Sequence, residues 1–331
     1  MAQIRDVARM AGVSPATVSR AYTQPDKVSP DTLARVREAA ENLNYKPNSM
    51  AKAFRGKSTD SVLILVPELS NVLFTRVLSG IERVATENNY YLLVSDTHDD
   101  VEIERSGVEL VETNRADGVI QLGGRPLEVL HKRGDDCGIP FVHAIEPVGH
   151  RPYPTVSVDN EAAAESMASY LLALGHRRIG VLAGIPDRDV TRTRLNGFRR
   201  ALAAYDLEYS PNDAEFNAFS LSGGAEAALR LLTRTPDLTA LFCMSDEIAI
   251  GAMRTCLDRG MRVPDDISIT GFDNIAFSRF SAPPLTTVMQ PAERMGEIAM
   301  TLMVNRLKGR PGQERQILPT ELVIRGSCRR I

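Results

Sequence analysis

The sequence predicts a small all-α domain at the N-terminus, followed by an α/β body of two doubly wound parallel-sheet lobes. Three observations lead to this fold class. Apolar residues recur at helical spacing within residues 3–44, and from residue 61 apolar runs of strand length alternate with helical segments. The alternation begins again after residue 160, which indicates a second lobe. With 331 residues, 43% of them hydrophobic, the chain can bury these cores.

Three short helices are predicted in the N-terminal domain. The first has an apolar face with helical spacing, formed by Ile4, Val7, Ala8 and Ala11. Gly12 ends this helix. Ser14-Pro15 and Ser29-Pro30 each combine an N-cap with a proline at the first helical position, so they begin the second and third helices. The third helix ends near Asn44.

A short segment separates these helices from the body. Asn48 is placed to cap one more helical turn or two, with Phe54 on its apolar side and Gly56 at its end. Such a segment is too short to be stable alone. The predicted boundaries are 1–47 for the N-terminal domain, 48–60 for this segment and its linker, and 61–331 for the body.

The body is predicted from strands that alternate with helices. In the first lobe the strands are SVLILVP, YYLLVSD, GVIQLGG and IPFVHAI, with helices across 72–89 and 100–115 and a short helix after residue 124. In the second lobe the strands are RRIGVLAG, ALFCMSD and DISITGFD, with helices near 161–174, 192–204, 223–234 and 247–259. Strands joined through helices in this way form parallel sheets.

Charge is distributed unevenly. Residues 1–60 carry ten Lys and Arg against six Asp and Glu, although the whole chain has a formal net charge of -3. A basic N-terminal segment on an acidic chain suits a polyanionic partner, and a solvated charged surface is the alternative until a motif supports the partner.

The composition indicates in which compartment the protein resides and whether it holds a metal site. The longest apolar runs, such as Val62–Val66 and Ile179–Ala183, fall far short of the roughly 20 residues that a membrane span needs. Charged residues among the first ten leave no apolar stretch for a secretory signal. The four cysteines are scattered without a C-x-x-C pair, and no histidine stands at metal-ligand spacing. We expect a cytoplasmic protein with no membrane span and no metal site.

Enzyme motifs are not found. Gly123-Gly124 is an isolated pair, and the chain has neither G-x-G-x-x-G nor a P-loop. No histidine is linked to a G-x-S-x-G elbow or to a carboxylate pair. We therefore expect no catalytic residue and no cofactor. A hydrolase on a doubly wound fold remains an alternative function, and turnover of nucleosides or glycosides by the purified protein would reveal it.

The first two predicted helices, with their tight turn, have a helix-turn-helix layout. In that layout the start of the second helix meets base edges in the major groove of DNA. Pro15, Ala16 and Arg20 would then face outward, with Val18 and Ala21 inward. Arg20 has the geometry for two hydrogen bonds to guanine, whereas the Ala16 side chain offers only a methyl group. On spacing alone, an ordinary three-helix surface domain remains an alternative.

A family resemblance covers nearly the whole chain. The stretch from IRDVARMAGVSPATVSR to NYKPN resembles the DNA-binding head of the lac repressor and galactose repressor family. The body resembles that family as well, with landmarks in the same order: LALGHRRIGVLAG, RLNGF, SDEIAIGAM, VPDDISITGFDN, PPLTTVMQP and ELVIRGS. The resemblance implies a periplasmic-binding-protein-like body, with an N-lobe of about 61–160 plus 292–320 and a C-lobe of about 161–291 plus 321–331.

The resemblance also implies a function. It predicts a sequence-specific transcriptional repressor whose affinity for double-stranded operator DNA is controlled by a small sugar or nucleoside effector bound between the lobes. It predicts a homodimer or a higher oligomer. A sugar-binding transport receptor would share the two-lobed body, but it would need an export signal and no DNA-binding head. This sequence has the reverse pattern.

The candidate DNA-binding residues come from the layout and the resemblance together. They are Ser14, Pro15, Ala16, Thr17, Arg20, Lys27, Asn48 and Phe54. Lys27 suits a phosphate contact, which sets register without reading sequence. Phe54 stands where the family usually has a leucine that wedges into the minor groove, and packing against the body or the dimer mate is the alternative. Because Pro15 and Ala16 offer few hydrogen bonds, the operator sequence is not predictable.

The candidate effector residues follow the carboxyl ends of the predicted strands, where open α/β sheets bind ligands. The resemblance assigns Phe74, Arg188, Arg194, Phe219 and Asp273 to the pocket, and position adds Arg125, Asp246 and Gln290. Asp273 and Arg194 suit the hydroxyl groups of a sugar ring, and Phe74 or Phe219 suits a flat apolar face. A nucleoside and a plain sugar both fit. Structural roles remain open, including helix capping by Asp159 or Asp246, a surface ion pair for Arg194 and a core position for Phe219.

Overall fold

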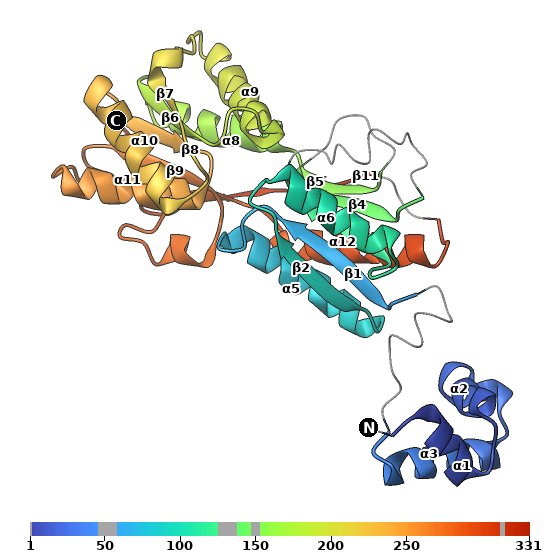
Figure 1. Ribbon diagram of the computed structural model, residues 1–331. Helices are drawn as coiled ribbons and strands as arrows, with labels where there is room; N and C mark the ends of the chain where they lie inside the picture. The colour runs from blue at the N-terminus through green and yellow to red at the C-terminus, as the bar shows by residue number, and fades with distance from the viewer. Residues whose placement is uncertain (1, 46–57, 125–137, 147–152, 312–314) are drawn as a thin grey trace. The chain divides into compact units, whose positions relative to one another are not determined.

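The computed structural model describes residues 2–45, 58–124, 138–146, 153–311 and 315–331 (Figure 1). The chain divides into two compact units, residues 1–59 and residues 60–331, and each is described separately below as the head and the body.

The head is made of short helices whose ends match the start and stop signals in the sequence. Gly12 has φ 65° at the end of the first helix, a conformation that costs glycine little. The side chains of Ser14 and Ser29 accept hydrogen bonds from the backbone N–H groups of Thr17 and Thr32, so both serines cap helices as predicted. The elements are α1 (Ile4–Ala11), α2 (Pro15–Thr23), the 3-10 turn η1 (Pro25–Lys27) and α3 (Pro30–Asn42).

Small side chains fill the core of the head. Alanine and valine predominate, which lets the three helices approach closely around Val18 and Val36, both fully buried. The buried set is Val7, Ala8, Ala11, Val18, Ala21, Val36, Ala39 and Ala40. The helical face predicted from residues 4–11 is therefore the face that packs inward.

The first sheet of the body has six parallel strands in the order β11-β5-β4-β3-β1-β2. Its strands are β1 (Ser61–Val66), β2 (Tyr91–Asp96), β3 (Gly118–Leu122), β4 (Phe141–Ile145), β5 (Thr155–Val158) and β11 (Arg315–Leu318). Helices cover both faces, as expected of a doubly wound sheet (Figure 1).

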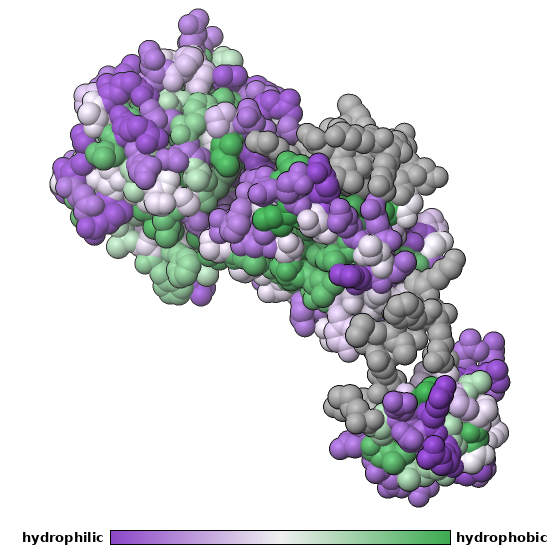
Figure 2. All heavy atoms as spheres, viewed as in Figure 1, coloured by the Kyte–Doolittle hydropathy of each residue, from purple (hydrophilic) through white to green (hydrophobic). Residues whose placement is uncertain are grey.

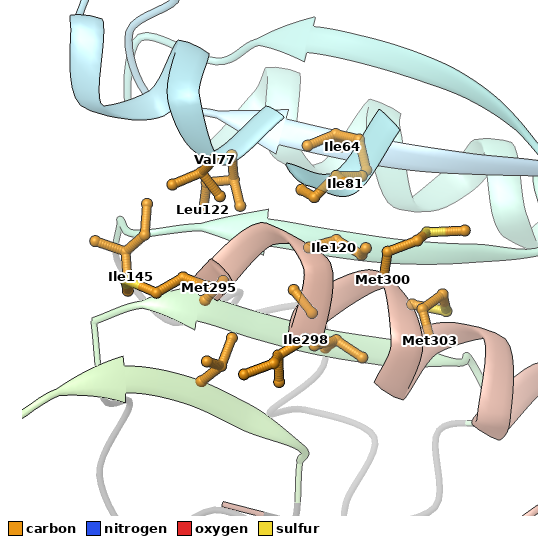
Figure 3. Packing of buried hydrophobic residues seen from close by; sticks show 14 of the residues in the cluster. Ile64, Val77, Ile81, Ile120, Leu122, Ile145, Met295, Ile298, Met300 and Met303 are labelled. Atoms are coloured by element: carbon orange, nitrogen blue, oxygen red, sulfur yellow. The ribbon is translucent and has the colours of Figure 1, made fainter. Parts of the chain in front are cut away.

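Alternate residues of β1 show how these layers form. Val62, Ile64 and Val66 face a core shared with α5 (Val72–Glu87) and α12 (Ala292–Leu307), as Figure 3 shows for Ile64 beside Val77, Ile81 and Met300. Leu63 and Leu65 face the opposite core, toward α6 (Val101–Glu112). A strand buried on both sides needs a continuous apolar run, which explains SVLILV.

The second sheet has the order β12-β10-β9-β8-β6-β7, parallel except that β12 runs antiparallel to β10. Its two faces contact α8 and α9 on one side and α10 and α11 on the other. The elements are β6 (Ile179–Ala183), β7 (Ala214–Phe216), β8 (Ala240–Cys243), β9 (Ser268–Asp273), β10 (Thr286–Met289), β12 (Glu321–Val323), α8 (Asn160–Ala173), α9 (Asp189–Ala203), α10 (Leu221–Arg234), α11 (Asp246–Asp258) and the 3-10 turns η2 (Pro211–Asp213) and η3 (Ala276–Arg279).

The chain passes between the two sheets after β5, after β10 and after β11. Each lobe is thus completed by a segment distant in sequence, and α12 packs on the first sheet although it follows nearly all of the second lobe. The predicted two-lobed parallel α/β fold is confirmed. The short strands β5, β7, β10, β11 and β12 and the helix α12 were not predicted as individual elements. Within the described residues, no helix is both long and apolar enough to cross a membrane.

Candidate functional site

The second helix of the head exposes one side to solvent. Val18 and Ala21 are buried in the head core, whereas Pro15, Ala16 and Arg20 are exposed. Ser14 is the N-cap, and its hydroxyl oxygen lies 2.9 Å from that of Thr17 and accepts the Thr17 N–H at 3.1 Å. Those two side chains therefore hold the first turn of α2.

Cations on the head surface differ in their partners. Arg9 and Arg35 lie 3.9 Å and 3.5 Å from Asp6 and Asp31, respectively. Arg20 is exposed and takes part in no ion pair among the described residues, and the same is true of Lys27. Two of the predicted DNA-binding residues, Asn48 and Phe54, lie outside the described residues.

In the second lobe, polar side chains converge at the carboxyl ends of β9 and β10. Arg194, on α9, donates from Nε to Asn160 Oδ1 at 2.9 Å and from Nη1 to the carbonyl oxygen of Met244. Its Nη2 lies 3.7 Å from Oδ1 of Asp273, the last residue of β9, and Gln290 Nε2 donates to the same oxygen at 2.7 Å. The strand ends thus bring together three predicted effector residues, Arg194, Asp273 and Gln290.

In the first lobe, a second polar group surrounds the turn after β3. Gly123 and Gly124 have φ values of 64° and 87°. A Cβ on Gly123 would lie 3.2 Å from Glu146 Oε1 and 3.7 Å from Phe74 Cε1, and one on Gly124 would lie 3.4 Å from Arg188 Nη1. The glycines therefore leave space between Phe74, Glu146 and Arg188.

Contacts cross from lobe to lobe. Arg188, which precedes α9 in the second lobe, donates from Nη2 to Asp99 Oδ2 of the first lobe. The N–H of Val72, at the start of α5, donates to Glu247 Oε1 of α11 at 3.3 Å. Because these bonds join facing strand ends, the two polar groups face each other at the boundary between the lobes, a region that we call the interlobe cleft.

Buried polar atoms without partners concentrate in these groups. Among the described residues, no hydrogen bond reaches certain atoms that are themselves almost inaccessible to solvent. They include Asp99 Oδ1, Glu146 Oε2, Asn160 Nδ2, Arg188 Nη1, Thr191 Oγ1 and Gln290 Oε1. Leaving a buried polar group unpaired costs about 1–3 kcal/mol. Such a concentration of unpaired donors and acceptors is typical of a site that a polar ligand completes.

Burial shifts the pKa values of the ionisable groups at the cleft. It raises the pKa of Glu146 to about 7 against the opposing effect of Arg188 and Arg194. It raises the pKa of Asp273 to about 7, although Arg194 and Gln290 lower it. Burial also lowers the pKa of His143 to about 4, so this imidazole is neutral at pH 7.

The remaining predicted effector residues occupy different places. Phe219 is partly buried and packs against both hydrophobic cores of the second lobe. A Cβ on Gly184 would collide with the Phe219 ring. Asp246 is fully buried, and its two oxygens accept from Thr287 Oγ1 and from the Ile275 N–H. Asp246 therefore connects α11 through hydrogen bonds to β10 and to the loop after β9. Arg125 lies outside the described residues.

Comparisons with known proteins identify the family of the chain. Residues 3–48 match the family model described as bacterial regulatory proteins, lacI family, and residues 168–328 match a periplasmic binding protein-like domain. The chain is 36% identical over 330 residues to the HTH-type transcriptional repressor CytR of Escherichia coli strain K12, covering 99% of this chain and 96% of that relative.

This chain belongs to the lacI family of bacterial regulatory proteins. Two solved structures of similar proteins extend over the full length. The lac repressor dimer bound to operator and the anti-inducer ONPF has a TM-score of 0.88 at 27% identity, with 99% of each chain covered. The complex of the transcriptional regulator CelR with cellobiose has a TM-score of 0.76 at 31% identity, with 99% of this chain and 100% of that chain covered.

For this lacI-family chain, the predicted family and the two-part fold are confirmed, and the chain is a DNA-binding transcriptional regulator. Sequence reasoning missed several polar residues of the cleft. Glu146 directly follows the strand IPFVHAI, so its position at a strand end was a usable signal. Asp159 accepts from the Ala162 N–H and caps α8, whereas Ser245, not Asp246, caps α11. Arg194 is buried, so it does not belong to a surface ion pair.

Proposed function

We propose that this chain is a cytoplasmic homodimeric repressor whose operator affinity is controlled by a neutral, polyhydroxylated effector in the interlobe cleft. The observation that carries the effector site is the set of buried polar atoms without partners at the facing strand ends. Hydroxyl groups both donate and accept hydrogen bonds, so one ring bearing several of them would satisfy Glu146, Asn160 and Arg188 together.

The charge balance of the cleft favours a neutral effector. Arg188 contacts Asp99, and Arg194 lies beside Asp273, so each described cation already has a carboxylate. Glu146 adds a further acidic group. A phosphate group would meet these carboxylates without a free cation among the described residues, at a large cost in a buried site. We therefore propose a sugar, polyol or nucleoside in preference to its phosphate ester.

On the DNA side, we propose that α2 enters the major groove. Arg20 reads a guanine, Ala16 and Pro15 contact the groove floor, and Ser14, Thr17 and Lys27 position the helix on the phosphates. Asn48 and Phe54 are assigned to the segment next to the minor groove. Effector binding shifts the lobes, changes the spacing of the two chains near residues 57–60, and so couples reciprocally to operator affinity by about 1–3 kcal/mol.

Exposed apolar side chains support the homodimer. Tyr91 and Val94 on the edge strand β2 are 75% and 46% exposed, and Phe280 after η3 is 72% exposed. Figure 2 shows apolar residues gathered over β2 and α5. Large exposed apolar surface is typical of protein interfaces, and two-fold symmetry would match a pseudo-palindromic operator.

A thermal-shift screen tests the effector class directly. Nucleosides, pentoses, hexoses and polyols are each compared with the matching phosphate ester. We expect one neutral compound to raise the melting temperature and its ester to have no effect, because binding to the native state alone stabilises it. Stabilisation by the ester alone would contradict the proposal. The compound found is then added to an operator-binding assay, where an unchanged affinity would rule out allosteric control.

A further inference from the structure

Outside the polar groups of the cleft, three metal-ligating side chains meet where β1 and β2 end. Glu68 lies in the turn after β1, Asp96 is the last residue of β2, and His98 follows it by two positions. One ligand atom from each lies within 4.8 Å of the other two, and His98 Nδ1 is 3.6 Å from Asp96 Oδ1. Ligands about 2.0–2.2 Å from a zinc ion lie roughly 3–4 Å apart, so small side-chain rotations would complete such a site.

The hydrogen bonds of this group leave ligand atoms available. Asp96 Oδ2 accepts from the Leu69 N–H at 3.3 Å, but the buried Asp96 Oδ1 accepts no hydrogen bond from any described residue. Glu68 Oε1 accepts from the Ser70 hydroxyl at 2.7 Å, which orients its carboxylate. A buried carboxylate oxygen that accepts no hydrogen bond is the kind of atom that a cation satisfies.

The local charge also calls for a cation. Neither Glu68 nor Asp96 has a Lys or Arg partner among the described residues, and His98 lies beside Asp96. Glu247 of the second lobe lies close enough that Glu68 adds to the effect of burial in raising the pKa of Glu247. Glu68 and Glu247 therefore bring acidic charge from both lobes close to Asp96 and His98.

We propose that Glu68, Asp96 and His98 bind a first-row divalent transition-metal ion such as Zn²⁺ at the rim of the cleft. One imidazole and two carboxylates suit zinc, whereas Mg²⁺ and Ca²⁺ prefer oxygen ligands alone. The spacing of ligands along the chain did not predict this site, because Glu68 comes from a different strand end.

The bound ion would order the turn that reaches the second lobe. His98 and Asp99 have φ values of 47° and 58°, so both occupy the left-handed region that side chains disfavour. Thr97 holds the turn on one side through its N–H, which donates to the Val66 carbonyl oxygen at 2.8 Å. Ligation by Asp96 and His98 would fix it on the other side and so hold Asp99 opposite Arg188.

Calorimetric titration of Zn²⁺ into the chelator-treated full-length chain tests the site. We compare the wild type with His98→Gln, Asp96→Asn and the matched control Glu109→Gln, which changes an exposed carboxylate on α6. Loss of one ligand should weaken one zinc site at least about tenfold, since even outer-shell changes cost 10–100-fold. Glu109→Gln should bind as the wild type does. All variants retain the cysteines, so zinc bound by thiols would not depend on His98.

Hydrogen exchange supplies a second readout that does not depend on DNA or effector. Zinc should slow exchange of the amides of residues 97–100 in the wild type and leave them unchanged in His98→Gln. The proposal is overturned if the four proteins give the same isotherm, if zinc produces neither heat nor protection, or if Mg²⁺ binds equally well without His98. If Asp96 and His98 form only an ion pair with each other, zinc would produce neither heat nor protection. None of these outcomes bears on repression or on the effector.

Discussion

Arg194 on α9 and Asp273 at the end of β9 form a buried pair, with Nη2 3.7 Å from Oδ1 and both residues at most 5% exposed. The Arg194 guanidinium also lies over the Phe272 ring, 3.5 Å from its centre. Because burial lowers the pKa of Arg194 only to about 10, the guanidinium stays charged at pH 7. This pair therefore places a fixed cation and a carboxylate at the base of the cleft.

Replacing Asp273 tests its proposed role in binding hydroxyl groups. Asp273→Asn keeps the shape but removes the charge, and hydrogen bonds to charged groups contribute about 1.5–3 kcal/mol. We expect the effector found in the screen to bind at least about tenfold more weakly by calorimetry. The control is Asp159→Asn, which retains a capping side chain on α8. Equal affinity in the wild type and Asp273→Asn would move the pocket elsewhere.

Stability should depend on pH because several buried carboxyl groups have raised pKa values. Burial raises the pKa of Asp246 to about 8 and that of Asp273 to about 7, above their unfolded values. The native state then binds more protons than the unfolded state, so stability falls as the pH rises from about 4 to about 8. Melting temperatures measured across this range should decrease steadily.

Asp246→Asn isolates one contribution to this decrease. The amide mimics the protonated acid, because it can accept from the Ile275 N–H and donate to the Thr287 hydroxyl. We expect the variant to melt within a degree or so of the wild type at pH 4 and at least about 2 °C higher at pH 9. A constant difference between the two proteins at all pH values would show that Asp246 does not titrate in this range.

Arg20→Ala tests the recognition helix. Arg20 is exposed on α2, so its loss should leave the head folded, while a bidentate contact to guanine contributes about 1–3 kcal/mol of discrimination. Footprinting against selected operator sequences should show preference for one base pair relaxed by about fivefold or more. Lys27→Ala is the comparison, since a phosphate contact should weaken all sequences alike and lower the salt dependence. Unchanged selectivity in Arg20→Ala would refute the assignment.

Removing residues 1–59 should leave a folded body, because the head and the body are separate compact units with their own cores. The shortened chain should melt cooperatively and bind the same effector with an affinity within about twofold, and it should lose operator binding. A shortened chain that fails to fold would contradict the modular architecture.

Phe280→Glu tests the proposed dimer surface. Phe280 is 72% exposed and belongs to the loop after η3, so a charge there should not unfold the monomer but should oppose association. Sedimentation should show more monomer at equal concentration, together with weaker operator binding. Tyr205→Glu changes a 39% exposed aromatic residue on another surface and should associate as the wild type does. If Phe280→Glu dimerises normally, the contact lies on another surface.

Local patterns in the sequence determined a large part of this structure. Gly12, Ser14 and Ser29 mark helix ends through their own backbone and side-chain chemistry, so the three α-helices of the head were predictable. Strands buried on both faces, such as SVLILV, need continuous apolar runs and were found for the same reason. The outward positions of Pro15, Ala16 and Arg20 followed from the helix-turn-helix layout and from the apolar inward side of the same helix.

Only the tertiary structure decided which polar side chains meet. Glu146, Asn160 and Arg188 lie in three different segments, and no local spacing relates them; the sheet order brings their strand ends together. Short strands such as β5 and β12 carry too few residues for a pattern, and long-range pairing alone fixes them. The sequence by itself thus determined the longer helices and strands and the family. Packing between distant segments determined the short strands and the cleft, because burial and pairing depend on residues that the chain brings together only when it folds.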